Sequence, residues 1–189
     1  VTDATDSGLI DASTNTQTGQ WGYDVTVGSL ALSASYNPKP GSATAPETAE
    51  SGYAVIYSGL MDGLELSAGL FDDGDTAEND TVGVKYTMGS VTAAYQITNV
   101  DYEATGSTDQ DASHYGISVA INEDLSISAG RQEIEFDGAA DDEVNTGLMA
   151  SYTMGSIAIG GGFNSVESVG GSATAEDIDA SIFNIAFSF

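Results

Sequence analysis

Residues 86–97 have the sequence Tyr-Thr-Met-Gly-Ser-Val-Thr-Ala-Ala-Tyr-Gln-Ile. After the Gly-Ser pair, larger apolar residues alternate with small or polar ones: Val91, Ala93, Tyr95 and Ile97 fall on one face, and Thr92, Ala94 and Gln96 on the other. An alternation of period two is typical of a β-strand, because successive side chains point to opposite faces. The Gly-Ser pair between two such runs predicts a tight hairpin turn.

The same alternation recurs along the chain, whereas helical periodicity is nearly absent. It predicts eleven strands, at residues 20–27, 29–37, 52–58, 62–71, 80–88, 90–101, 113–121, 124–136, 145–153, 156–166 and 178–189. The motif Tyr-Thr-Met-Gly-Ser at residues 86–90 returns at residues 152–156, which indicates repeated hairpins. We therefore expect an all-β, antiparallel chain.

The predicted connections alternate between short and long. The short ones contain Gly28-Ser29, Asp62-Gly63, Gly89-Ser90, Glu123-Asp124 and Gly155-Ser156, and the long ones fall near residues 37–51, 72–80, 101–113, 137–144 and 165–177. Many of the predicted strands approach the roughly 9–11 residues with which a tilted strand crosses a bilayer. Short turns at one end and long loops at the other are typical of a transmembrane antiparallel β-barrel.

The charge of the chain excludes some classes of function. There are 29 Asp and Glu residues against 3 Lys and Arg, for a formal net charge of -26. Nucleic-acid binding is excluded because a phosphate backbone requires basic partners. There is no Cys, which excludes disulfides and thiolate metal sites.

The sequence contains no recognisable catalytic set. Its single histidine, His114, lies at the edge of a long acidic loop and is interpreted as a solvated side chain rather than a base or a metal ligand. No Gly-rich phosphate loop precedes a helix. We therefore expect neither an enzyme nor a required cofactor.

One acidic loop is a candidate site for a divalent cation. Residues 72–80 contain five acids: Asp72, Asp73, Asp75, Glu78 and Asp80. Carboxylate oxygens are suitable ligands for Ca²⁺ or Mg²⁺, although the full spacing of a twelve-residue calcium loop is absent. The alternative is a solvated acidic loop.

If the apolar faces contact lipid, the opposite faces line a wet interior. Strand parity then predicts five pore-lining residues: Asp24, Glu65, Lys85, Gln96 and Asn184. Arg131 shares parity with Leu125, Ile127 and Ala129, but Ile134 and Phe136 have the other parity. A bulge between them would explain the change, so neither Arg131 nor Gln132 is assigned to a face.

The last predicted strand, 178–189, carries the clearest family signal. Phe183, Ile185, Phe187 and Phe189 share one parity, and Phe189 is the final residue. A terminal aromatic on an alternating strand resembles the assembly signal read by the barrel assembly machinery of the outer membrane. With the hairpins, the whole chain resembles the C-terminal portion of a Gram-negative general porin of the alphaproteobacterial type.

The resemblance implies a water-filled outer-membrane channel for passive diffusion of small hydrophilic solutes and ions. It further implies sixteen strands in the full barrel, of which these would be the sixth to the sixteenth. It also implies a homotrimer in contact with outer-membrane lipid and lipopolysaccharide. Residues 1–19 would then be the end of an inward-folded constriction loop, with Asp3, Asp6 and Asp11 as candidate constriction residues, and residues 20–189 the C-terminal strands of one barrel domain.

The chain departs from the family pattern in its basic residues. Such porins carry an Arg/Lys cluster facing acids across the constriction, whereas the basic residues here are Lys39, Lys85 and Arg131. Either the basic cluster lies on other strands or the pore prefers cations strongly. We expect the second, a cation-preferring channel.

The sequence leaves two alternative interpretations open. One is an outer-membrane barrel with a plugged lumen, acting as an adhesin or structural protein. The other is a secreted acidic β-protein that binds calcium. A requirement for detergent would separate the second from either barrel.

Overall fold

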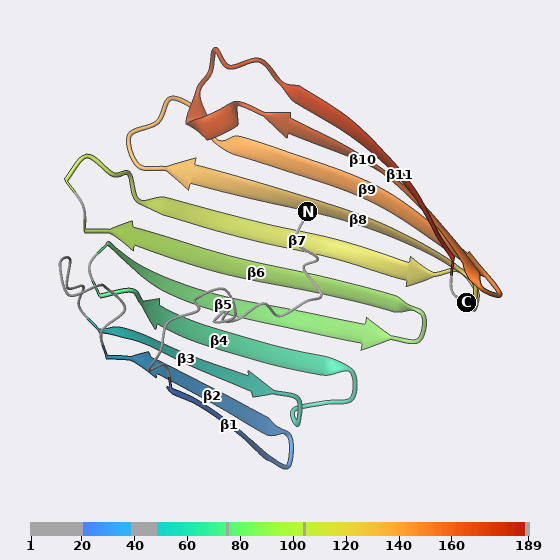
Figure 1. Ribbon diagram of the computed structural model, residues 1–189, viewed down its shortest axis with the longest axis horizontal. Coiled ribbons are helices and arrows are strands. Elements are labelled where there is room, and N and C mark those ends of the chain that lie inside the picture. The colour runs from blue at the N-terminus through green and yellow to red at the C-terminus, as the bar shows by residue number, and fades with distance from the viewer. Residues whose placement is uncertain (1–20, 39–48, 75, 104, 188–189) are drawn as a thin grey trace. The chain divides into compact units, whose positions relative to one another are not determined.

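The computed structural model describes residues 21–38, 49–74, 76–103 and 105–187. They form eleven strands in one antiparallel sheet whose order follows the chain (Figure 1). The strands are β1 (Trp21–Val27), β2 (Leu30–Asn37), β3 (Glu50–Tyr57), β4 (Leu64–Asp72), β5 (Ala77–Met88), β6 (Val91–Tyr102), β7 (Gln110–Ala120), β8 (Leu125–Phe136), β9 (Glu143–Met154), β10 (Ile157–Glu167) and β11 (Ile178–Phe187). A 3-10 turn, η2 (Val169–Gly171), follows β10. The predicted all-β class and all eleven predicted strands are confirmed.

The described residues fall into two compact units that divide β5 and β6 between them. One unit lies within Ser7–Val84 and Ile97–Asp111, and contains β1–β4. The other lies within Lys85–Gln96 and Ala112–Phe189, and contains β8–β11 and nearly all of β7.

In the first unit, β1–β4 are joined in a register that aligns the apolar side chains across the strands. One row across the four strands is Tyr23, Ala34, Tyr53 and Leu70, and the next is Val25, Leu32, Val55 and Ala68. The row between them, on the opposite face, is Asp24, Ser33, Ala54 and Gly69. Because a slip of one residue would exchange the two faces, this register keeps every large apolar side chain of these rows together.

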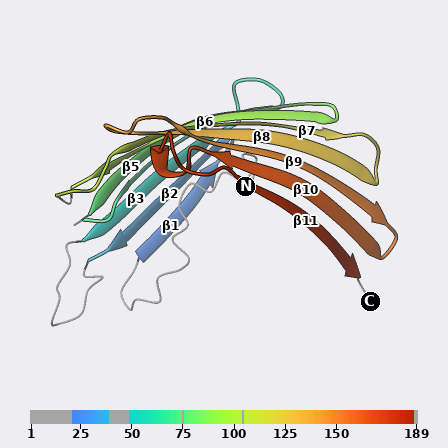
Figure 2. The same cartoon turned by 90° about the horizontal axis from the view of Figure 1, so that it is seen from above.

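In the second unit, β8–β11 lie side by side in chain order in both views (Figures 1 and 2). One row of the apolar face is Leu125, Tyr152, Ile159 and Ile185. A row of the other face is Ser126, Ser151, Gly160 and Asn184. The pairing of β8 with β9 runs without interruption from Leu125 to Ile134, so no bulge lies within this stretch. We call the two faces of each unit the apolar face and the polar face.

Tight turns close the hairpins where the sequence predicts them. Val27 pairs with Leu30, and Met154 pairs with Ile157, so each turn contains two residues, Gly-Ser. Gly28 and Gly155 have φ of 62° and 60°, a left-handed conformation that glycine adopts without steric penalty. A positive φ at the first of two turn residues matches the twist of the flanking strands.

The connection between β4 and β5 is shorter than expected. The predicted loop 72–80 is replaced by a turn between Asp72 and Ala77, and Glu78 and Asp80 belong to β5. Backbone amides of Thr76 and Ala77 donate to the Asp73 carboxylate at 2.7 and 2.8 Å. The prediction of a nine-residue acidic loop was wrong because the Asp73 carboxylate caps a tight turn, so that the strand begins earlier.

The sheet has no hydrophobic core among the described residues. Ala77, with 7% of its surface exposed, is the one hydrophobic residue there that is buried, whereas Trp21 and Phe183 are each 72% exposed. A soluble β-sandwich would cover its apolar face with a second layer. In the described ranges, no helix is long and apolar enough to span a membrane.

Candidate functional site

The polar face of β1–β4 carries two of the predicted pore-lining acids. Asp24 of β1 is exposed and lies opposite Ser33 of β2. Glu65 of β4 is half-buried and shares the parity of Ser67 and Gly69. The structure therefore places both carboxylates on the face opposite the large apolar side chains.

Lys85 of β5 and Gln96 of β6 also share one face. The hydroxyls of Thr87 in β5 and Thr92 in β6 are 3.1 Å apart, so these two threonines lie on the same face of the sheet. Lys85 has the same parity as Thr87, and Gln96 has the same parity as Thr92. Both Lys85 and Gln96 are half-buried and engaged in interactions with other groups. Their shared face agrees with the parity argument, and their role as pore-lining residues stays a prediction.

Asn184 of β11 lies on the polar face opposite Gly160 of β10. The amide oxygen of Asn184 occupies the space that a Cβ on Gly160 would need. Glycine at position 160 is therefore what allows this amide to lie across the neighbouring strand.

The candidate constriction residues Asp3, Asp6 and Asp11 lie outside the described residues, as do Asp75 and Phe189. Their predicted roles in the constriction, the cation loop and assembly stay predictions. The same holds for the boundary between a loop at 1–19 and the strands that follow.

Three of the remaining acids of the candidate cation loop share a hollow but are not arranged to hold a metal ion. Asp72, Glu78 and Asp80 line a hollow of about 300 Å³ together with Asp101 of β6. Asp72 accepts the amide of Gly74 at 2.6 Å, and Asp80 accepts the Asn99 amide group at 3.1 Å. Among the described residues, no group of three or more acids or histidines has the arrangement to hold a metal ion.

Arg131 is placed on the apolar face of β8, near the middle of the strand. It pairs with Thr146 of β9, in the same parity as Ala129 and Leu148. Its guanidinium Nη2 lies 3.7 Å from the Oε2 of Glu133, two residues along the same strand. The basic group is thus partly neutralised beside the apolar face, and the adjacent Gln132 lies on the polar face.

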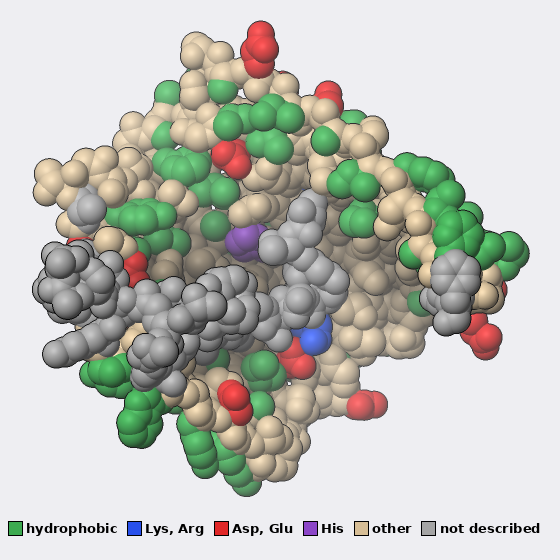
Figure 3. Space-filling view, viewed as in Figure 1, with side chains coloured by type: hydrophobic (Ala, Val, Ile, Leu, Met, Phe, Trp, Pro, Cys, Tyr) green, Lys and Arg blue, Asp and Glu red, His purple; other side chains and the backbone are tan. Residues whose placement is uncertain are grey.

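Sequence reasoning missed a hollow on the polar face of β7–β10. It has a volume of about 570 Å³ and is lined by the side chains of His114, Gln132, Asn145 and Asn164, with serine hydroxyls beside them. In Figure 3 the histidine, in purple, lies next to tan and green surface. The parity of Asn145 and Asn164 was readable from the sequence, but their position beside Gln132 required the register.

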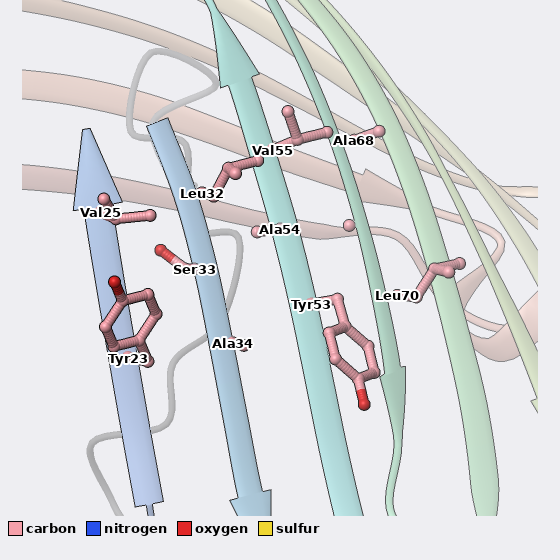
Figure 4. Close-up of a pocket in the computed structure, with 11 residues that line it drawn as sticks. Tyr23, Val25, Leu32, Ser33, Ala34, Tyr53, Ala54, Val55, Ala68 and Leu70 are labelled. Atoms are coloured by element: carbon pink, nitrogen blue, oxygen red, sulfur yellow. The ribbon is translucent and has the colours of Figure 1, made fainter. Parts of the chain in front are cut away.

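The apolar face carries a groove of its own across β1–β4. The rings of Tyr23 and Tyr53 flank Ala34, and Val25, Leu32, Val55, Ala68 and Leu70 complete the lining (Figure 4). The volume is about 450 Å³. Small alanines between larger side chains leave this recess on a face that has no covering layer in the described residues.

A sheet with one exposed apolar face and one polar face is the arrangement of an outer-membrane barrel wall. A family model for Gram-negative porins matches residues 1–189. The chain belongs to the Gram-negative porin family. This membership assigns the porin chain to the outer membrane of a Gram-negative cell, and the predicted family and localisation are confirmed.

Solved porin structures share the fold of this porin chain. A porin refined at 1.8 Å resolution matches with a TM-score of 0.69 and 17% identity, over 89% of this chain and 60% of that one. A loop L8 deletion mutant of OmpT from Vibrio cholerae gives a TM-score of 0.70 and 16% identity, over 89% and 62%. A mutant of the Rh. blastica porin gives 0.65 and 19%, over 90% and 55%.

The porin chain spans less than two thirds of the length of each of these structures. No curated protein matches it. At these identities the solved structures establish the antiparallel porin-barrel fold and nothing about the solutes of this chain.

Proposed function

We propose that the full-length protein forms a water-filled channel for passive diffusion of small hydrophilic solutes and ions across the outer membrane. One observation carries the proposal: the sheet exposes large apolar side chains on one face and small or polar ones on the other, with no hydrophobic core in the described residues. Lipid covers the apolar side chains of the first face, and only water or solute in a lumen can hydrogen-bond to the polar groups of the second. Porins are channels rather than enzymes, and the proposed mechanism is diffusion without a chemical step.

A preference for cations is the finer part of this proposal. The net charge of -26 and the carboxylates of Asp24 and Glu65 on the polar face support it. Charge along a wet pore raises the local concentration of counter-ions and biases which ions pass. Among the described residues, Lys85 is the basic residue that shares the polar face, and it would offset part of this field.

We further propose a homotrimer that contacts outer-membrane lipid and lipopolysaccharide and is inserted by the barrel assembly machinery, with Phe189 as part of the assembly signal. Family membership supports these partners. No cofactor is required for diffusion, and Ca²⁺ or Mg²⁺ at the acidic β4–β5 turn is a candidate accessory ligand because hard cations prefer carboxylate oxygens.

The test is the conductance of the full-length protein in a planar bilayer under a KCl gradient. We expect stepwise currents in groups of three and a reversal potential that favours K⁺. Asp24→Asn and Glu65→Gln together are expected to shift that potential toward zero, with Asp62→Asn in a tight turn as the matched control. Folded, inserted protein without conductance would contradict the channel and favour a plugged adhesive or structural barrel.

A further inference from the structure

The hollow on the polar face of β7–β10 is built by the strand register. Gln132 lies opposite Asn145, and in the neighbouring row Gly130 lies opposite Gly147, which in turn lies opposite Asn164. The two glycines have no side chain, so the surface is recessed between the amide pair and the next row. Ser128 and Met149 form that next row. The result is a recess of about 570 Å³ lined by hydrogen-bonding groups together with apolar side chains such as Met149 and Val166.

The lining of this recess differs from the chain as a whole in its charge. Although the chain has 29 acids, none of the described residues that line the recess is an Asp or a Glu. Arg131 is its one charged lining residue in the described part, and its parity directs that side chain to the apolar face, where Glu133 accompanies it. An ion entering the recess therefore meets amides, hydroxyls and the His114 imidazole, but no carboxylate of the described residues.

Asn164 adds a second, independent observation. Its side-chain oxygen is buried, and no described group donates a hydrogen bond to it. A buried acceptor without a donor is unfavourable, because it has lost the hydrogen bonds that water would donate to it. Because the amide torsion of asparagine is broad, a turn about χ2 presents this oxygen to a donor that enters the recess.

We propose that this recess is a contact site for uncharged polyhydroxylated solutes, such as sugars and polyols, on their way through the lumen. Amide groups offer a donor and an acceptor side by side, and hydroxyls offer both in one atom, which matches the paired hydroxyls of a sugar. The site rests on the proposed channel, because the polar face must be wet for a solute to reach it. Contacts of this kind are weak enough for the solute to leave, as passage requires.

The experiment uses the full-length protein in a planar bilayer, with sucrose as the neutral probe and gluconate as a charged one. We expect sucrose to add excess noise to the open-channel current, and gluconate to add none. Asn164→Leu, which keeps the number and branching of the side-chain heavy atoms but removes the amide, is expected to weaken the apparent sucrose affinity about three- to tenfold, consistent with the loss of one to two hydrogen bonds. Gln132→Met is expected to act in the same direction.

Thr153→Val is the matched control, because Thr153 lies on the polar face of β9 opposite Ala158 and does not line the recess. It should leave both conductance and sucrose noise unchanged. Normal conductance with no sucrose noise, or noise that Asn164→Leu leaves unchanged, would overturn the proposed contact site.

A second measurement separates the failure of this site from the failure of the channel. Saturation-transfer NMR on the folded, detergent-solubilised protein reports contact with sucrose without any current. Transfer that Asn164→Leu reduces and Thr153→Val does not reduce supports the site even if conductance is absent. Transfer that is absent, or equal in all three proteins, overturns it.

Discussion

Gly160 of β10 lies directly opposite Asn184 of β11, and the Asn184 amide oxygen fills the space that a Cβ on Gly160 would occupy. Gly160→Ala is therefore expected to force the Asn184 side chain out of its rotamer, at about 0.5–1.5 kcal/mol. The measurement is urea unfolding of the full-length protein in lipid. Gly22→Ala is the control, because its Cβ would meet open space. If Asn184→Ala fails to relieve the effect of Gly160→Ala, the contact is not its cause.

The carboxylate of Asp73 holds the β4–β5 turn together through the backbone amides of Thr76 and Ala77. Asp73→Ala leaves these two donors without their acceptor and should lower the free energy of unfolding by about 1–2 kcal/mol. Asp73→Asn keeps an acceptor oxygen and should lower it by less. Thermal unfolding of the two variants, compared with wild type, checks the order; equal losses would show that charge, not hydrogen bonding, matters at this turn.

Glu143 ties the loop after β10 to the start of β9. Its carboxylate accepts the backbone amide of Gly170 at 2.8 Å and the Asn145 amide group at 2.9 Å. Glu143→Ala should free the segment around η2 and speed its cleavage by an added protease several-fold, because local opening exposes the backbone. Glu176→Ala, which removes an exposed acid from the same loop, is the control and should leave the rate unchanged. Equal cleavage rates in both variants would show that the Glu143 hydrogen bonds do not hold this loop in place.

Neighbouring residues of β11 test the assignment of the two faces. Phe183 lies on the apolar face and Ile182 on the polar face, opposite Gly161 and Gly162 respectively, and both are exposed. Phe183→Lys is expected to destabilise the barrel by about 2–4 kcal/mol if the site is near the bilayer midplane. Ile182→Lys should be tolerated, since its ammonium group would be in water. Urea titrations in lipid vesicles measure the stability of both variants. A larger loss of stability in Ile182→Lys than in Phe183→Lys would show that the two faces are assigned the wrong way round.

The strands and their faces were predictable because period-two alternation is a local property of the sequence. The Gly-Ser pairs at 28–29 and 155–156 predicted two-residue turns, and the structure confirms them. The β4–β5 connection was mispredicted because side-chain capping by Asp73 depends on a folded turn rather than on composition. The face of Arg131 was left open, and the uninterrupted pairing of β8 with β9 decides it.

The sequence by itself determined the all-β class, the eleven strands, the two faces of most strands and the resemblance to Gram-negative porins. It did so because alternation and turn residues are properties of a few neighbouring residues, and the charge composition is counted without knowledge of any contact. Only the tertiary structure decided which side chains meet across strands: Asn184 over Gly160, Glu143 on Gly170, and Gln132 and Asn145 beside Asn164. The physical reason is that register is set by pairing between distant segments, and parity fixes the face of a residue but not its neighbours on that face.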